Sequence, residues 1–363
     1  MDTAFGYSFP AIRGVQAGKE YYVSMCPMRL IPKIFLFNEE ELIPELRAQR
    51  ILNKARIPEM TRYVTENPES YIFSAITASL DGVVKFDPIS TALDESKIGV
   101  LHIQMDARFI INDGQHRRAA IEAAIREKPQ LADESIAVVF FVDTGLERSQ
   151  QMFADLNRYA IRPSRSLSVL YDHRDDGARL TKIVVAQSPI FSGLVEMEKS
   201  SLSMRSSKLF TLSAVYTANS ALLSDIHDRS FEDMCALASE FWEALAMNIP
   251  EWEMVVNGTI TSSEVRQNFI HSHGIALQAF GRIGRAIISR PNAKFKSSLK
   301  VIKSMNWRKD NLEELEGRAM IGGRVSKSSN NVTLLTNLIK IKMGLALSPD
   351  EQRIEDAKAR GDL

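Results

Sequence analysis

The patterning of apolar residues changes near residue 165, and this change constrains the fold more than any other feature. Before it, apolar runs of strand length are bounded by Gly, Pro and Asp-Gly, as at residues 71–80 and 136–142. After it, apolar residues recur at helical spacing as far as residue 288. We therefore predict an α/β domain over residues 1–165 and a mainly α-helical domain over residues 166–363, an α+β chain overall.

Within these domains the patterns predict individual elements. One strand pair is expected around Asp106-Ala107, formed by residues 99–105 and 108–111. Further strands are predicted at residues 21–23, 34–37, 71–80 and 136–142, and helices at residues 39–66 (with breaks at Pro44 and Pro58), 115–126, 146–156, 167–171, 177–186, 209–223, 231–247 and 263–288.

The charge balance limits how the chain can meet nucleic acid. Lys plus Arg number 45 and Asp plus Glu number 45, so the net charge is zero. This excludes a uniformly basic protein that binds nucleic acid through its overall charge, and any such role needs a local patch. Cys26 and Cys235 are far apart and form no CxxC pair, which fits a reducing cytoplasm. No signal peptide or membrane-spanning run is visible, so we expect a cytoplasmic protein without membrane contact.

Residues 109–120 (FIINDGQHRRAA) predict a strand, a tight turn and the start of a helix. Gly114 permits a positive φ and a close approach, and the first helical turn presents free N–H groups that favour anions. Basic side chains at His116, Arg117 and Arg118 reinforce this preference. The alternative is an ordinary chain reversal with solvated arginines and a structural histidine. The predicted phosphate-binding residues are Gly114, Gln115, His116 and Arg117.

Residues 113–117 read DGQHR, and on this motif the chain resembles the DGQHR-domain family, a branch of the ParB/sulfiredoxin superfamily. Residues 49–68 and the FADLNR segment at 153–158 resemble that family's flanking helix and downstream motif. Through FGYSFPAIRG, LNRYAIRPSRSLSVLYDHRD and LTNLIKIKMGLAL the whole chain is similar to the DndB family of bacterial DNA phosphorothioation systems. The resemblance implies a ParB/sulfiredoxin-like first domain and a DNA-binding regulator that represses transcription of the sulfur-modification genes.

The superfamily includes several chemistries. ParB-type clamps bind or hydrolyse nucleoside triphosphates through this turn, so the resemblance leaves open ATP or another NTP with Mg²⁺. Hydrolysis needs a group that positions water, and Asp113 and His116 are the candidate catalytic residues. Sulfiredoxin chemistry is excluded because Gln115 stands where a catalytic Cys is needed. The absence of a GxxxxGK[ST] sequence excludes a P-loop ATPase.

The stretch between Glu264 and Asp310 contains ten basic residues and no acidic one. Such a stretch suits the phosphate backbone of double-stranded DNA, and Phe295 and Trp307 lie within it. The alternative is a solvated face whose acidic partners come from elsewhere in the fold. A second cluster, Arg158, Arg162 and Arg165, fits either phosphate contact or a polar linker. The candidate DNA-binding residues are Arg158, Arg162, Arg165, Arg282, Arg285, Lys294, Lys296, Lys300 and Lys303.

Two other groups of residues are weaker candidates for a functional site. The Ser-rich residues 199–208 predict a surface loop, and the alternative is that its hydroxyls and N–H groups contact backbone phosphates. His271 and His273 have no third partner nearby and would point apart on a helix, so no metal site is predicted.

Three functions follow as hypotheses. The first is a repressor that binds the promoter of the phosphorothioation cluster as a homo-oligomer, with other phosphorothioation proteins as further partners. The second is an NTP-hydrolysing component of the modification system. The third is a ParB-like nuclease, which is weaker because the motif offers one carboxylate where metal-dependent cleavage needs several.

Overall fold

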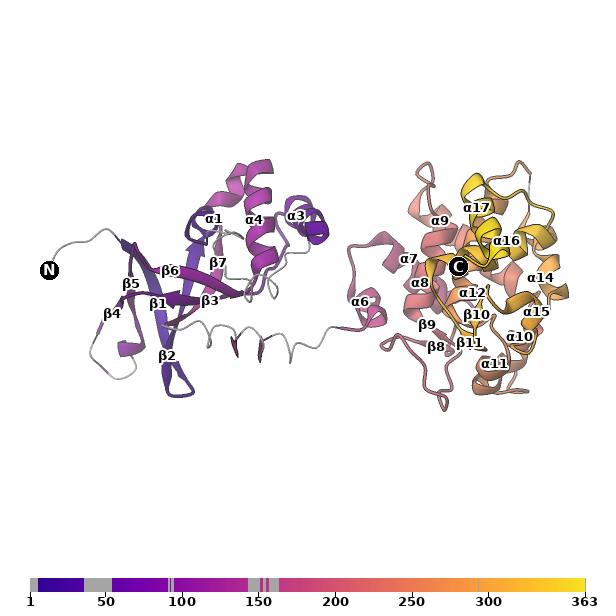
Figure 1. Ribbon diagram of the computed structural model, residues 1–363, viewed down its shortest axis with the longest axis horizontal. Helices are drawn as coiled ribbons and strands as arrows, with labels where there is room; N and C mark the ends of the chain where they lie inside the picture. Colours follow the sequence, from indigo (N-terminus) through magenta and orange to yellow (C-terminus); the bar gives the residue numbers. More distant parts are fainter. Residues whose placement is uncertain are drawn as a thin grey trace. The chain divides into compact units, whose positions relative to one another are not determined.

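The chain forms two compact units, Met1–Ile161 and Arg162–Leu363. The computed structural model describes residues 6–35, 54–90, 92, 95–142, 151–152, 155–156, 163–292 and 294–362. Strands dominate the first unit and helices the second (Figure 1). The predicted combination of strands and helices is therefore confirmed. None of the described helices is long and apolar enough to cross a bilayer.

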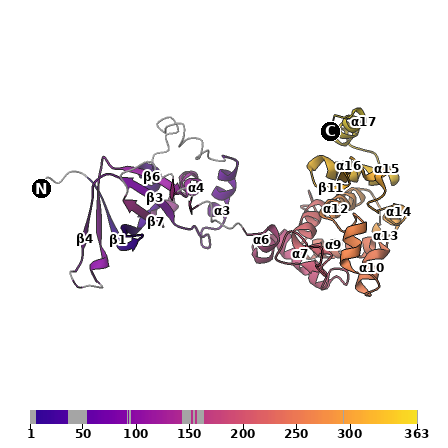
Figure 2. The same cartoon turned by 60° about the horizontal axis from the view of Figure 1, so that its bottom comes forward.

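The first unit is built on a seven-stranded mixed sheet with the order β4-β5-β1-β2-β7-β3-β6. Among the described strand pairs of this sheet, only β3 and β7 pair in parallel. Helix α4 packs against α1 and α3, and the turned view in Figure 2 again places α3 beside α4. The elements are β1 (Gly6–Gln16), β2 (Lys19–Pro27), η1 (Met28–Leu30), α1 (Ile31–Ile34), η2 (Lys54–Arg56), α3 (Ile57–Glu66), β3 (Ile76–Asp81), β4 (Val84–Pro88), η3 (Glu95–Lys97), β5 (Ile98–Gln104), β6 (Arg108–Asp113), α4 (Gln115–Glu127), η4 (Pro129–Asp133) and β7 (Ser135–Val142).

Alternation along the strands builds the core of this unit. In β7 every second side chain is buried, at Ile136, Val138 and Phe140. Phe140 packs against Phe9 of β1 and Phe109 of β6. The strands predicted at residues 21–23 and 136–142 are confirmed, whereas the strand predicted at 71–80 begins only at Ile76.

The pairing predicted around Asp106-Ala107 is wrong. β5 pairs with β1 and β4, whereas β6 pairs with β3. Short connections join β3 to β4 and β5 to β6, so these strands are consecutive parts of one long bent hairpin. Asp106-Ala107 therefore continues one arm of this hairpin, and the chain reverses between β4 and β5.

The strand predicted at residues 34–37 is also wrong at its start, because Ile34 ends helix α1. Pro32 stands in the first turn of α1, where its fixed φ suits a helix. Of the predicted helix at 39–66, α3 covers the last part, and residues 36–53 lie outside the described residues. Most of the predicted helix at 146–156 lies outside them as well.

The second unit packs its helices around one large apolar core. The predicted helix at 263–288 is two helices, α11 and α12, because the backbone between them bonds to residues 307–309 instead of continuing the helix. The elements are α6 (Arg165–Tyr171), α7 (Asp176–Gln187), β8 (Val195–Glu196), β9 (Phe210–Thr211), α8 (Leu212–Leu222), α9 (Phe231–Ala246), α10 (Pro250–Val256), α11 (Ser262–Asn268), α12 (Gly274–Ile288), α13 (Phe295–Ser298), α14 (Lys300–Ser304), α15 (Leu312–Leu315), β10 (Met320–Ile321), β11 (Arg324–Val325), α16 (Ser329–Lys342) and α17 (Pro349–Arg360).

Helices α8 and α12 lie against each other through small residues. Gly274 faces Ala214, Gly281 faces Ala218 and Gly284 faces Leu222, so the two helices run in the same direction. A Cβ at position 281 would collide with the carbonyl oxygen of Ala218. The two backbones can approach this closely only because residue 281 has no side chain.

We expect Gly281→Ala to lower the free energy of unfolding of the second unit by about 2 kcal/mol, because the added methyl forces two helices apart. Urea unfolding followed by tryptophan fluorescence measures this loss. Ala286→Gly on the same helix is the control for altered helix propensity, with a loss of about 1 kcal/mol. An unchanged Gly281→Ala protein would contradict the close approach of α8 and α12.

His273 precedes α12 and is partly buried. Its Nε2 lies 2.9 Å from the carbonyl oxygen of Arg266. Burial, together with the nearby charge of Lys309, lowers the pKa of His273 to about 4. At neutral pH the ring is therefore uncharged and Nε2–H donates to this carbonyl.

The lowered pKa of His273 makes the stability of the fold depend on pH. Below pH 6.5 the unfolded chain binds this proton more readily than the folded chain, so stability falls as the pH falls toward 4. We expect His273 to account for about 2 kcal/mol of the loss at pH 5. Urea unfolding at pH 7 and pH 5 measures the loss, which should be smaller in His273→Gln; equal losses in both proteins would contradict it.

Candidate functional site

The DGQHR segment forms the junction between β6 and α4, as predicted. Asp113 ends β6, and α4 begins at Gln115. Gly114 has a φ of +111°, in the left-handed region that favours glycine. A Cβ there would also lie 3.0 Å from Ile76 and 3.1 Å from the Arg117 guanidinium. Both the backbone conformation and the space therefore select glycine.

Arg117 folds back over this turn. Its Nη2 donates to Asp113 Oδ2 at 2.7 Å and to the Ala75 carbonyl at 3.2 Å, and its Nη1 donates to Ser74 Oγ at 2.5 Å. The Nε atom is buried and has no hydrogen-bond partner among the described residues. Arg117 thus ties the turn to the chain before β3 and retains one unused donor.

Two arginine charges act on the His116 ring. Burial lowers the pKa of His116, the charges of Arg56 and Arg117 lower it further, and Asp113 acts in the opposite direction. The ring is therefore neutral at pH 7. Arg56, at the end of η2, is a neighbour that the sequence analysis missed, since nothing local relates residue 56 to residue 116.

The start of α4 has no side-chain cap from its N-cap residue. Gly114, the N-cap residue, has no side chain to cap the helix, and Gln115 is the partly buried first helical residue. The N–H groups of a first helical turn carry a partial positive charge that attracts anions. Gly114, Gln115, His116 and Arg117 are thus brought together around one helix end.

Arg118 has a different role. Its Nε donates to the Phe35 carbonyl at 2.9 Å, and its Nη1 donates to Glu122 Oε2 at 2.7 Å. A further bond from Nη2 reaches the carbonyl of Pro32. The Arg118 side chain therefore links α1 to α4, and it does not add to the positive charge at the DGQHR turn.

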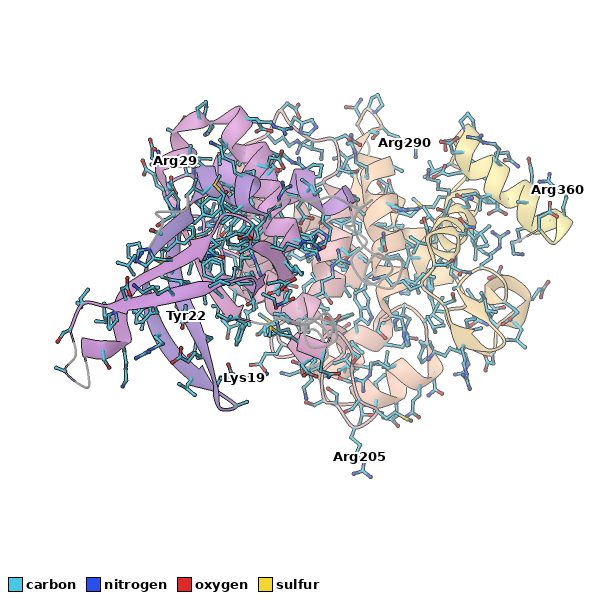
Figure 3. The ribbon with its side chains drawn as sticks, turned by 60° about the vertical axis from the view of Figure 1, so that its left-hand side comes forward. Lys19, Tyr22, Arg29, Arg205, Arg290 and Arg360 are labelled. Carbon is cyan, nitrogen blue, oxygen red and sulfur yellow. The ribbon has the colours of Figure 1, made fainter. Side chains whose placement is uncertain are left out.

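Four lysines of the basic stretch form an exposed surface. We call Lys294, Lys296, Lys300 and Lys303 the lysine segment. All four are exposed, and the last three are spaced by four and three residues in the successive helices α13 and α14. Phe295, Leu299 and Ile302 between them are buried in the core. The segment is therefore a charged surface on a fixed apolar base, and Arg290 before it, labelled in Figure 3, is also exposed.

Among the other predicted DNA-binding residues, Arg282 and Arg285 are less accessible than the lysine segment. Arg282 is partly buried and donates to Thr333 Oγ1 at 2.9 Å, and burial lowers the pKa of its guanidinium. Arg285 donates to the carbonyl of Asp225. Arg165 is exposed on α6, where its charge acts on Lys327. Arg158 and Arg162 lie outside the described residues.

Phe295 and Trp307 are also not available to nucleic acid. Both are buried, and Trp307 Nε1 donates to the Ile302 carbonyl at 2.9 Å. Base stacking by these rings, which their place among basic residues suggested, does not fit their burial. Among the residues that the structure describes, no group of three or more His, Cys, Asp or Glu side chains is arranged to hold a metal.

The comparisons with known proteins cover nearly the whole chain. The family model described as "DndB: DNA-sulfur modification-associated" matches residues 9–346. No curated protein and no solved structure matches the chain. The match confirms the family expected from the sequence, and the placement within the DGQHR and ParB/sulfiredoxin groups stays a prediction.

Proposed function

Because the chain belongs to the DndB family of DNA-sulfur modification-associated proteins, we propose that it is a DNA-binding transcriptional repressor of a bacterial phosphorothioation gene cluster. The lysine segment carries this proposal. Its four ammonium groups are exposed and rest on buried apolar side chains, in a stretch without acidic residues. Such a surface contacts the phosphates of a duplex and positions the protein on it.

The repressor acts as a homo-oligomer in this proposal. Two copies related by a two-fold axis present two lysine segments to paired half-sites of an operator. Other phosphorothioation proteins are further partners of the same assembly.

The DGQHR turn is the phosphate- or nucleotide-binding element in this proposal. The start of α4 without a side-chain cap, the unused Nε–H of Arg117 and the nearby charge of Arg56 support it. A triphosphate bound there would place its negative charge beside these donors.

A nucleoside triphosphatase is the second candidate, and the exposure of Asp113 favours it. Half of the Asp113 side chain is exposed, and Oδ2 pairs with Arg117, which leaves Oδ1 for a Mg²⁺ ion. Bound Mg²⁺ would neutralise charge on the phosphates. The neutral ring of His116 would accept a proton from the attacking water. The nuclease hypothesis gains no support from the described part of the chain.

Fluorescence anisotropy with a labelled promoter duplex tests the repressor function. We expect binding whose affinity falls steeply between 50 and 200 mM salt, as for proteins that neutralise several phosphates. Phosphate release from ATP with Mg²⁺, with and without the duplex, tests the second candidate. No salt-sensitive binding by the wild-type protein would contradict the repressor.

A further inference from the structure

The parallel arrangement of α8 and α12 brings their N-terminal ends to one pocket of the second unit. This pocket has a volume of about 560 Å³. Thr211, Ser213 and Ala214 line it from the start of α8, and Ser272, His273 and Gly274 line it from the start of α12. Both helix dipoles therefore direct their positive ends at the same space.

The backbone donors at these ends have little capping. The side chains of the two N-cap residues, Thr211 and His273, make no capping hydrogen bond. One N–H of α8, that of Ser213, donates to Ser166 Oγ at 3.2 Å. Two parallel helices with unneutralised N-terminal ends repel each other, and an anion between them would offset this repulsion.

Three cationic side chains line the same pocket. Lys327 Nζ lies 3.2 Å from the position of a Cβ on Gly274, directly over the positive end of α12. Lys309 Nζ donates to the Arg266 carbonyl at 2.6 Å. The Arg266 guanidinium donates to backbone carbonyls of the Ser-rich loop at residues 199–208. None of the described residues that line the pocket is acidic, so no lining carboxylate balances these charges.

The surroundings lower the pKa values of the two lysines that line the pocket, Lys309 and Lys327. Burial lowers the pKa of Lys327, and the charge of Arg165 lowers it further. Burial also lowers the pKa of Lys309. Lys309 is only partly accessible and Lys327 remains exposed, and a bound anion would stabilise the charged form of both ammonium groups.

Ser272 points independently to a ligand. Its side chain lines the pocket and is buried, with 4% of the residue exposed. Its hydroxyl has no hydrogen-bond partner in the part of the chain that the structure describes. A buried hydroxyl without a partner costs about 1–3 kcal/mol, and a ligand oxygen would satisfy it.

The other residues that line the pocket indicate which chemical group is attached to the anion. Leu202, Met204 and Leu209 offer apolar surface, and Ser200 and Ser201 offer hydroxyls. The volume lies within the usual range of about 300–1,000 Å³ for small-molecule sites. Figure 3 shows Arg205, in the same loop, extending away from the ribbon, so this arginine is not one of the pocket's cations.

We propose that this pocket binds a nucleotide-sized organic phosphate, with the phosphate group between Lys309, Lys327 and the ends of α8 and α12, and the organic part against Leu202 and Met204. The site belongs to the second unit alone and is independent of the DGQHR turn. It therefore stands whether or not the proposed function is correct.

Calorimetric titration of the full-length protein with AMP, inorganic phosphate and adenosine tests the proposal. We expect AMP to bind, inorganic phosphate to bind more weakly and adenosine not to bind. Lys327→Met should weaken AMP binding at least about tenfold and Ser272→Ala by about threefold. Lys19→Met, an exposed-lysine control outside both proposed sites, should leave AMP binding unchanged. Loss of AMP binding in Arg117→Ala together with normal binding in Lys327→Met would assign the ligand to the DGQHR turn and overturn the proposal.

Thermal unfolding supplies a second readout that does not depend on added ligand. Without ligand, Lys327→Met should unfold at the wild-type temperature or above it, because an uncompensated cation has been removed. AMP should raise the unfolding temperature of the wild type and not that of the variant. The proposal is wrong if neither AMP nor phosphate binds, if AMP binds both proteins equally, or if Lys327→Met without ligand unfolds well below the wild type.

Discussion

Replacing the four residues of the lysine segment with glutamine is expected to weaken binding of the promoter duplex about a thousandfold for each bound protomer at 0.15 M salt. Each lysine that neutralises a phosphate contributes about 0.9 to the slope of log affinity against log salt, so the slope should fall by about 3.6 for each bound protomer. The four side chains are exposed while the apolar residues between them are buried. Removing their charge should therefore leave the fold intact, and anisotropy titrations at several salt concentrations measure both effects.

A matched variant separates this surface from general charge. Lys19, Lys33 and Lys97 are exposed lysines of the first unit. Their replacement by glutamine should change affinity only slightly. If these replacements weaken binding and the lysine-segment variant binds normally, the DNA contact lies in the first unit and the assignment is wrong.

Arg117→Ala is expected to weaken ATP binding at the DGQHR turn at least about a hundredfold, because it removes a charge-assisted donor at the helix end. The same change leaves Asp113 and Ser74 without their guanidinium partner, which should lower the free energy of unfolding by about 2 kcal/mol. Binding should therefore be measured well below the unfolding temperature. The Lys327→Met background removes any contribution from the second-unit pocket.

Two further variants make this result specific. Arg126→Ala changes an exposed arginine at the other end of α4 and should bind ATP normally. Arg117→Lys keeps the charge but cannot reach Asp113, Ser74 and Ala75 together, so it should recover little binding. If the wild type releases phosphate from ATP, His116→Ala should abolish turnover. Unchanged ATP binding in Arg117→Ala would mean that the turn only reverses the chain.

The DGQHR turn shows which features of the site can be predicted from neighbouring residues in the sequence. Asn112, Asp113 and Gly114 between an apolar strand and an Ala-rich helix predict the junction, because a turn and a helix start depend on neighbouring residues. The partners of Arg117 lie 42 and 43 residues away, at Ala75 and Ser74. Nothing local predicts these contacts, which depend on how β3 pairs with β6.

The basic stretch between Glu264 and Asp310 also has one property that the sequence predicts and one that only the structure shows. Its charge is visible in the sequence, but the exposure of each side chain is not. Arg282 and Lys300 are both basic residues of helices, yet Arg282 is partly buried against α16 and Lys300 is exposed. The difference depends on which face of each helix meets a neighbour, which is a property of the packed unit.

The sequence by itself determined the family, the succession of strands and then helices, the strand–turn–helix at residues 108–127 and the local excess of positive charge. These follow from periodicity and from residues close together in the chain. Only the tertiary structure decided the bent hairpin, the neighbours of His116 and the pocket between α8 and α12. That pocket joins residues from about 200 to 327 because small residues let two distant helices pack in parallel, and such contacts depend on the folded arrangement of the whole unit.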